Sequence, residues 1–451
     1  MQVPEQLINE LKENFEVDIS AFENAHHKPV PVSVRLNPLK LISVFNEGKQ
    51  IPWTNNAYYL NERPVFTNDP LFHAGCYYVQ EASSMFVEQA VKQTTDTSKK
   101  IIALDACAAP GGKSTLLASL LNEESLLLSN EVISTRVPVL THNLVKWGTA
   151  NTMVSNNDPK DFARLPDFFD LMVVDAPCSG SGLFRKQEDA IEHWSEESVK
   201  HCSLRQQRIL HDLIPSLKEN GVLIYSTCSY STLENEAICD FIISEFGLEP
   251  MQLQIKAEWG IRETKSRNGG FGYRFFPHLV EGEGFFLSCF RKAKKDTTAS
   301  ETRSNKVLSK LNQEEEKKAK QFINKDNFEF AKFFDEIVAY SKNISEEVKT
   351  ICSALKIKKM PLHLGQLKGN DFIPHPYSAY ITCLSQNTSK AEVNAEEAMK
   401  YLRKQNFNLP DAQKGFVLLT YRNFGLGWAK NIGNRVNNYY PADWRVLKEI
   451  F

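Results

Sequence analysis

Five short apolar runs between Ile101 and Thr227 alternate with amphipathic stretches, and this alternation constrains the fold more than any other feature of the chain. The runs read IIALDA, SLLLSNE, NTMVSN, DLMVVDA and GVLIYST. Strands that are apolar on both faces and alternate with helices form right-handed βαβ units, with a parallel sheet between helical layers. The sequence therefore predicts an α/β fold with a doubly wound, mostly parallel sheet. GFGYRFFPHLV and GFFLSCFRK are expected to close it as a β-hairpin that ends near Lys292.

The 451 residues are too many for one core, so we expect several domains. The expected divisions are an N-terminal α/β extension (1–90), the sheet-bearing domain (91–292), a charged linker (293–321) and a C-terminal region (322–451). In the C-terminal region, FEFAKFFDEIVAYSKNI predicts an amphipathic helix. GFVLLTY and LGWAKNIGNRVNNYYPADWRV predict a small β-rich module.

The composition excludes several classes of protein. A hydrophobic content of 42% and a charged content of 24% are ordinary for a globular protein. No run approaches the ~18 apolar residues that cross a bilayer, and MQVPEQLINELKENFEV lacks the order of a signal peptide. We therefore expect a cytoplasmic protein with no membrane partner. The nine cysteines include no C-x-x-C pair, which argues against a disulfide framework or a metal site and leaves reduced thiols for chemistry.

Charge is distributed unevenly along the chain. From Leu355 to Phe451 there are 14 Lys and Arg against 7 Asp and Glu, a net of +7, whereas the whole chain carries −2. The part before Leu355 therefore carries −9. A basic C-terminal part suits a polyanionic partner, although a solvated basic surface explains the charge equally well.

The glycine-containing loop LDACAAPGGKST follows the first predicted strand and opens a helix. Ligands of doubly wound sheets bind beyond the carboxyl ends of the strands, and a helix start offers free N–H groups to an anion such as a carboxylate. The residues expected to line the ligand are Cys107, Ala108, Ala109, Pro110, Gly111, Gly112 and Lys113. A nucleotide triphosphatase loop needs glycine five positions before its Gly-Lys, and Cys107 stands there, so that alternative is disfavoured.

Acidic residues follow the next three strands: Glu131 the second, Asp158 the third and Asp175 the fourth. A carboxylate in such a place can accept hydrogen bonds from ribose hydroxyls or contact an adenine edge. Each acid taken alone is equally well explained as a helix cap. Three of them facing one glycine loop predict a pocket for an adenosine-containing ligand without phosphates, and S-adenosylmethionine meets this description.

Cys178 and Cys228 stand directly beyond the fourth and fifth runs, in DAPCSGSG and YSTCSYSTLENE. Carbon 5 of a pyrimidine is a poor nucleophile until a group adds at carbon 6, and a thiolate is the side chain best suited to that addition. A second acid–base group helps to expel the thiolate afterwards, and Asp175 could hold the extruded base. Free cysteines often fill apolar gaps, but the flanking Pro, Ser, Gly and Thr predict loops above the sheet. The pattern therefore predicts cytosine-5 methylation.

DACAAPGGKST, DAPCSGSGLFRK and YSTCSYSTLENE, in this order and spacing, resemble the motifs of the RNA cytosine-5 methyltransferases of the Rsm/Nop2/Sun superfamily. The resemblance implies a Rossmann-like, class I S-adenosylmethionine-dependent methyltransferase with Cys228 as nucleophile and Cys178 in product release. The residues alone do not rank the two cysteines. The C-terminal GFVLLTY…LGWAKNIGNRVNNYYP resembles the PUA-like module of the RsmF-type branch, which implies that residues 322–451 bind RNA, with the N-terminal extension.

The leading hypothesis is an S-adenosylmethionine-dependent enzyme that forms 5-methylcytosine in 16S (small-subunit) rRNA. The same chemistry on transfer RNA is one alternative, and a non-catalytic RNA-binding or ribosome-assembly protein is another. We expect RNA or the small ribosomal subunit as partner, no DNA, and a monomer.

Overall fold

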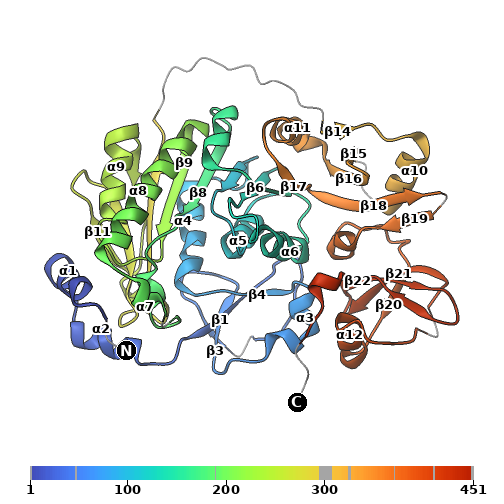
Figure 1. Ribbon diagram of the computed structural model, residues 1–451, viewed down its shortest axis with the longest axis horizontal. Helices are drawn as coiled ribbons and strands as arrows, with labels where there is room; N and C mark the ends of the chain where they lie inside the picture. Colours follow the sequence, from blue (N-terminus) through green and yellow to red (C-terminus); the bar gives the residue numbers. More distant parts are fainter. Residues whose placement is uncertain are drawn as a thin grey trace.

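The computed structural model describes residues 3–45, 48–187, 189–293, 307–323, 327–369, 371–409 and 412–447. Its central feature is a ten-stranded sheet of order β11-β12-β13-β9-β8-β5-β6-β7-β17, with β10 paired to β13 (Figure 1). The parallel strands are β5 (Ile102–Asp105), β6 (Leu126–Asn130), β7 (Thr152–Ser155), β8 (Phe169–Asp175) and β9 (Leu217–Thr227). They coincide with the five apolar runs, so the predicted parallel core is confirmed.

Helices cover both faces of this sheet. On β5, Ile102 and Leu104 belong to the core under α8 and α9, whereas Ala103 belongs to the core under α4 and α5. Consecutive residues of a strand point to opposite faces, so a strand covered on both sides must be apolar throughout. The helices of this part are α4 (Val87–Thr94), α5 (Gly112–Leu120), α6 (Val137–Trp147), α7 (Asp189–His193), α8 (Glu196–Leu213) and α9 (Glu236–Phe246).

Antiparallel strands extend the sheet beyond β9. β13 pairs with β9, β12 with β13 and β11 with β12. These strands are β10 (Glu249–Met251), β11 (Arg262–Lys265), β12 (Phe271–Phe275) and β13 (Phe285–Arg291). The pairing of β12 with β13 confirms the predicted closing hairpin.

The N-terminal part packs a small antiparallel sheet, of order β2-β3-β1-β4, against the start of α5. Its elements are α1 (Glu5–Phe15), α2 (Ile19–His26), β1 (Val32–Leu36), β2 (Lys49–Gln50), β3 (Ala57–Leu60), α3 (Pro70–His73) and β4 (Tyr77–Val79). Arg35 on β1 is buried, and its guanidinium donates to the Gly112 carbonyl at 3.2 Å and to Thr115 Oγ1 at 2.6 Å. The extension is thus fixed to the helix that begins at the predicted cofactor loop.

The segment FEFAKFFDEIVAYSKNI is a hairpin of β15 (Phe328–Phe333) and β16 (Glu336–Ser341). The prediction of an amphipathic helix is therefore wrong here. Aromatic and β-branched side chains dominate both halves and favour strands. Phe334, with φ of 52°, adopts the left-handed conformation of the two-residue turn between them.

This hairpin belongs to a five-stranded sheet of order β14-β15-β16-β18-β19. The other elements around it are β14 (Leu308–Ser309), α10 (Gln313–Phe322), β18 (Leu362–Lys368) and β19 (Asp371–Pro374). Of the predicted charged linker, residues 294–306 lie outside the described residues. The rest of it contains β14 and most of α10.

The C-terminal half also contributes to the central sheet. β17 (Ile357–Lys359) is an antiparallel edge strand beside β7, and α11 (Ser345–Ala354) precedes it. Val348 and Ile351 of α11 lie in the same hydrophobic core as Met153 of β7. The expected boundary at residue 322 therefore separates two parts that share a core.

A buried lysine marks this junction. The ammonium of Lys359 donates to the carbonyl oxygens of Thr152 and Met360 at 2.8 and 3.1 Å. Burial lowers the pKa of Lys359 to about 7. A charged or polar group of this kind is tolerated in a core because its hydrogen bonds are made, and the bond to Thr152 ties β17 to β7.

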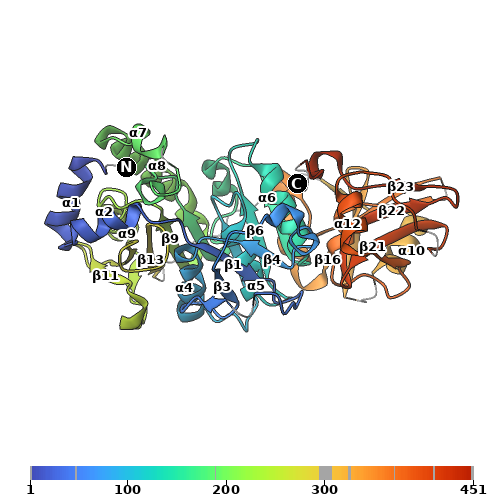
Figure 2. The ribbon, with the colours of Figure 1, turned by 90° about the horizontal axis from the view of Figure 1, so that it is seen from below.

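The last part of the chain forms a four-stranded sheet of order β20-β21-β22-β23, which confirms the predicted β-rich module. Its elements are β20 (Lys390–Glu392), α12 (Ala395–Leu402), β21 (Gly415–Tyr421), β22 (Phe424–Asn431) and β23 (Val436–Asn438). Leu402 of α12 shares a core with Leu71 of α3. Figure 2 shows α1 and α2 at one end of an elongated molecule and this module at the other. Among the described residues, no helix has the length and apolar character to cross a membrane.

Candidate active site

The loop Cys107–Lys113 connects the end of β5 to the start of α5, at the carboxyl edge of the parallel strands. Gly111 has φ of 112°, in the region that favours glycine, and it directly precedes the helix. Side chains of Arg136 and Asn143 donate to carbonyl oxygens of the loop at 2.6 and 2.8 Å. The first N–H groups of α5 have no partner within the helix, so this edge can receive an anionic group.

A carboxylate that the sequence reasoning missed lies at the base of this loop. Asp105 ends β5 and is fully buried. Ser114 Oγ donates to its Oδ2 at 2.6 Å, and its Oδ1 has no hydrogen-bond partner among the described residues. Burial raises the pKa of Asp105 to about 7. The rule that selected Glu131, Asp158 and Asp175, an acid at a strand end, also applies to Asp105.

Glu131 and Asp158 each bind their own loop. Glu131 is buried, and its Oε1 accepts the Ile133 N–H at 2.8 Å, while its Oε2 lies 3.5 Å from Arg136 Nη1. Asp158 accepts the Lys160 N–H at 3.2 Å and caps a short 3-10 helix. The helix-cap explanation therefore holds for Asp158, and a contact of either acid with ribose or adenine stays a prediction.

The structure brings Cys178 and Cys228 together beyond β8 and β9, with their sulfur atoms 2.9 Å apart. The hydrogen bond with Cys228 and burial raise the pKa of Cys178 well above its ordinary value. Both side chains are only partly buried, unlike Cys239 and Cys289, which fill the core. Burial also raises the pKa of Cys107, so that its thiol stays protonated.

Asp175, the last residue of β8, lies beside the cysteines and has both oxygens engaged. Lys113 Nζ is 2.8 Å from Oδ2, and Ser226 Oγ donates to Oδ1 at 2.8 Å. Burial opposes the charge of Lys113, but the charge and hydrogen bond of Asp175 outweigh it, and a Cys228 thiolate acts in the same direction, so the pKa of Lys113 is raised. Lys113 therefore links the predicted cofactor loop to the carboxylate of Asp175, a pairing that spacing along the chain did not predict.

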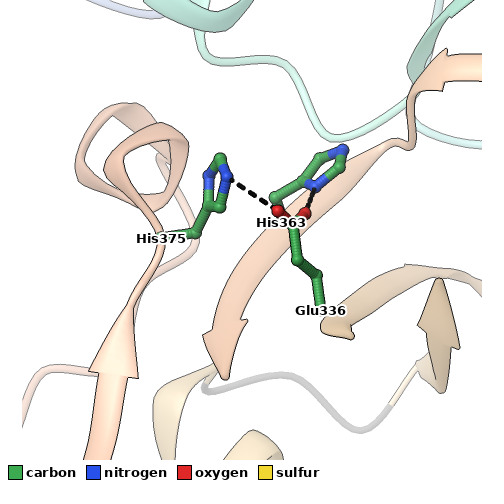
Figure 3. A group of neighbouring side chains, drawn as sticks. All are labelled: Glu336, His363 and His375. Atoms are coloured by element: carbon green, nitrogen blue, oxygen red, sulfur yellow. Dashed lines mark hydrogen bonds and ion pairs between the residues drawn. The ribbon is translucent and has the colours of Figure 1, made fainter. Parts of the chain in front are cut away.

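A second cluster of titratable groups lies in the C-terminal region, where Glu336, His363 and His375 face one another (Figure 3). Within the described ranges it is the one group of three side chains with the spacing of metal ligands. His363 Nδ1 and His375 Nε2 lie 2.5 and 3.3 Å from the oxygens of Glu336. The opposite ring nitrogens accept the backbone N–H groups of Met360 and Tyr377.

These backbone contacts fix which ring nitrogens of the cluster carry protons. A nitrogen that accepts an N–H has no proton, so in a neutral imidazole the nitrogen facing Glu336 carries it. A metal needs a lone pair at that nitrogen and a donor at the other. The cluster is therefore arranged as a hydrogen-bonded clasp between β16, β18 and the segment after β19.

Solved structures of known proteins share the fold. A methyltransferase homologue protein from Pyrococcus horikoshii is 28% identical, with a TM-score of 0.55, over 64% of this chain and 95% of that chain. NSun6 from Pyrococcus horikoshii, solved with SFG, is 19% identical, with a TM-score of 0.54, over 65% of this chain and 99% of that chain. The residues present fit S-adenosylmethionine, because α5 offers N–H groups to its carboxylate and Asp105 Oδ1 is a free acceptor. Fold and site define a Rossmann-like S-adenosylmethionine-dependent methyltransferase.

Family models match three successive parts of the chain: the N-terminal domain of 16S rRNA methyltransferase RsmF (residues 3–82), 16S rRNA methyltransferase RsmB/F (92–291) and the methyltransferase RsmF PUA domain (388–446). Ribosomal RNA small subunit methyltransferase F of Aliivibrio fischeri (strain ATCC 700601 / ES114) is 30% identical over 95% of this chain and 94% of that protein. The protein of that name from Psychromonas ingrahamii is 29% identical over 95% and 94%. The chain belongs to the RsmB/F family of RNA methyltransferases, and the resemblance noted in the sequence is confirmed.

Proposed function

We propose that this enzyme forms 5-methylcytosine in the RNA of the small ribosomal subunit, with Cys228 as nucleophile and Cys178 in product release. The observation that carries the chemistry is the pair of thiols 2.9 Å apart, beside a lysine that is ion-paired to Asp175. The names of the relatives and the PUA domain support ribosomal RNA over transfer RNA.

The surroundings of Cys178 support its proposed role. The hydrogen bond with Cys228 and burial raise the pKa of Cys178, which therefore stays protonated. A neighbouring protonated thiol can stabilise a thiolate when it leaves. The choice of Cys228 as the nucleophile is carried over from the family.

In the proposed reaction the sulfur of Cys228 bonds to carbon 6 of cytosine, and the electron pair of the C5–C6 double bond makes carbon 5 nucleophilic. Asp175, held by Lys113 and Ser226, binds the polar edge of the base. S-adenosylmethionine supplies the methyl group when it is bound by the loop Cys107–Lys113 together with the strand-end acids, including Glu131, Asp158 and Asp175. Loss of the carbon-5 proton to a base and cleavage of the carbon 6–sulfur bond restore the double bond. The S–H of Cys178 donates to the departing thiolate.

The experiment incubates wild-type, Cys178→Ala and Cys228→Ala proteins with S-adenosylmethionine and 16S rRNA, followed by denaturing gels. We expect a protein–RNA adduct that survives denaturation with Cys178→Ala and none with Cys228→Ala. Cys383→Ala, which removes another partly buried thiol, in the C-terminal region, is the matched control and should behave as wild type. A reversed pattern would exchange the two roles.

The substrate arms decide between the alternatives. Methyl transfer to transfer RNA but not to 16S rRNA would change the substrate and keep the chemistry. Binding of RNA without methyl transfer to either would point to the non-catalytic RNA-binding or assembly protein.

The proposal also assigns RNA binding to the two parts outside the catalytic domain, residues 1–90 and residues 322–451. Deleting the C-terminal half would remove β17 and part of the shared core, so charge reversal is the cleaner test. Lys414, Arg422 and Arg435 are exposed on the last module. Replacing all three by Glu should weaken RNA binding and flatten its salt dependence, because each lost phosphate contact reduces the slope by about 0.7–0.9. An unaltered slope would make the basic surface merely solvated. A monomer in the cytoplasm stays a prediction.

A further inference from the structure

A single carboxylate touches both cysteine loops. Ser179 follows Cys178, and both its N–H and its hydroxyl donate to Glu234, at 2.7 Å to Oε1 and 2.6 Å to Oε2. Ser229 follows Cys228, and its hydroxyl donates to the same Oε2 at 2.5 Å. Glu234 therefore joins two loops that are 50 residues apart in the chain.

Glu234 is itself held in place by the surrounding fold. The side chain has no exposed surface. The Tyr225 hydroxyl on β9 donates to its backbone carbonyl at 2.7 Å, and Gln206 Nε2 of α8 lies 3.4 Å from Oε1. Burial raises the pKa of Glu234, although the hydrogen bonds from Ser179 and Ser229 oppose this. A buried carboxylate held by neutral donors tolerates little displacement, because each lost donor leaves charge unsatisfied.

The hydrogen bonds that Glu234 accepts from the two cysteine loops come from the residues that follow the cysteines, so it positions the thiols through the backbone. Besides the hydrogen bond with Cys228 and burial, its charge also acts on Cys178 and raises the pKa of that thiol. Displacement of either loop by about 1 Å would separate the sulfur atoms, and misplacements of this size cost on the order of 100-fold in reactions that depend on near contact.

We propose that Glu234 is a positioning residue that sets the distance between Cys178 and Cys228, and that product release depends on it. The positioning role is argued from the contacts alone. The dependence of product release on Glu234 rests on the proposed function.

The distance is tested without RNA, by oxidising the thiol pair with diamide. Diamide takes up two electrons and the two thiol protons as the Cys178–Cys228 disulfide forms, and mass spectrometry of the digested protein measures the linked peptides. We expect Glu234→Ala to slow this oxidation at least about tenfold. Glu234→Gln keeps the length and can still bond the hydroxyls, so it should restore much of the rate. An unchanged rate in a folded Glu234→Ala protein would overturn the proposal.

Glu10→Ala is the matched control. Glu10 lies on α1 and accepts hydrogen bonds from the N–H and the hydroxyl of Thr232, each at 2.6 Å. It therefore holds the segment that follows Cys228 but makes no bond to Ser179. Its loss should leave the oxidation rate unchanged, and an equal slowing would reduce Glu234 to a general support of the segment. If Glu234→Ala does not fold, Ser229→Ala takes its place. It removes the hydrogen bond from Ser229 to Glu234 and should still slow oxidation of the thiol pair. A wild-type rate in Ser229→Ala would then overturn the proposal.

The consequence for catalysis is read on the denaturing gel. Glu234→Ala, with Cys178 intact, should accumulate the protein–RNA adduct as Cys178→Ala does, because the release thiol is out of reach. Slow oxidation with no adduct in any variant, Cys178→Ala included, would sink the proposed function and leave the positioning role standing. Slow oxidation with an adduct in Cys178→Ala but none in Glu234→Ala would overturn the dependence of release on Glu234.

Discussion

Cys178 and Cys228 face each other at the carboxyl edge of the parallel strands, whereas Glu336, His363 and His375 face one another inside the C-terminal region. Both clusters bring titratable groups within hydrogen-bond distance. In the histidine cluster the scaffold bonds to the titratable atoms themselves, since each imidazole uses one nitrogen for a backbone N–H and the other for Glu336.

In the cysteine cluster a backbone hydrogen bond from Gly180 reaches Cys178, but the bonds that join the two loops are made by the neighbouring residues. Ser179 and Ser229 are tied to Glu234, while the sulfur atoms of the two cysteines contact each other and both residues stay partly exposed. The difference shows how a cluster can be held in place while the sulfur of Cys228, the proposed nucleophile, stays available: the hydrogen bond from Ser229 to Glu234 ends one residue away from it. Proximity of titratable groups alone would have ranked both clusters as candidate sites.

The largest effect should come from the proposed nucleophile. Cys228→Ala should reduce methyl transfer by about 10⁴-fold or more, as loss of a covalent catalyst commonly does. Incorporation of labelled methyl groups into 16S rRNA measures it. His375→Gln, in the other cluster, should leave methyl transfer within a few-fold of wild type. A comparable loss in that variant would erase the distinction between a reactive and a structural cluster.

The second effect concerns the free energy of unfolding, which should fall between pH 5 and pH 8. Asp105 has a folded-state pKa of about 7, above its ordinary value of 3.8, so its contribution to stability is lost as the pH rises through about 7. Between pH 5 and pH 8 the wild type without cofactor should lose about 2–3 kcal/mol that Asp105→Asn does not lose. Urea unfolding at the two pH values measures the difference. Equal losses in both proteins would mean that Asp105 ionises normally.

The third effect has the opposite sign and belongs to the histidine cluster. Burial lowers the pKa of His363 to about 4, although Glu336 opposes this, so stability is lost as the pH falls from 6.5 toward 4. The wild type should lose about 2 kcal/mol between pH 7 and pH 5 that His363→Gln does not lose. His211→Gln, at an exposed histidine on α8, should keep the wild-type loss. If it does not, the acid sensitivity lies elsewhere.

The smallest effect is an expected absence of change. Zn²⁺ added to the Cys178→Ala variant, in which the thiol pair is broken, should leave the melting temperature unaltered, because the protonated nitrogens of the histidine cluster face the would-be ligand position. A rise that disappears in His363→Gln would show that the cluster binds metal and that its hydrogen bonds rearrange.

The sequence predicted the parts of this molecule that local pattern determines. The five strands followed from apolar runs, and the cysteine loops followed from their place beyond strand ends. The pattern of FEFAKFF fits a helix or a strand, and only the turn at Phe334 and the pairing with β18 decide it. The three-residue strand β17 has no pattern to detect.

The contacts that organise the site also escaped prediction, because they join residues that are distant in the chain. Lys113, just after β5, is ion-paired to Asp175 at the end of β8. Glu234 accepts a hydrogen bond from Ser179, which lies 55 residues earlier in the chain. Asp105 is the exception, since its position at a strand end was visible in the sequence. What separates it from the other acids is burial, which only the packed fold supplies.

The placement of β17 has a consequence for how the protein folds during its synthesis. Ser155 of β7 is paired with Ile357, so everything between them must be synthesised before that edge of the central sheet is covered. At the usual pace of about 5–20 residues per second, this leaves an open strand edge for some 10–40 seconds, within reach of other nascent chains. The predicted cofactor loop and both cysteines are synthesised well before the sheet is closed, and chaperone demand should therefore peak while the C-terminal half is still being made.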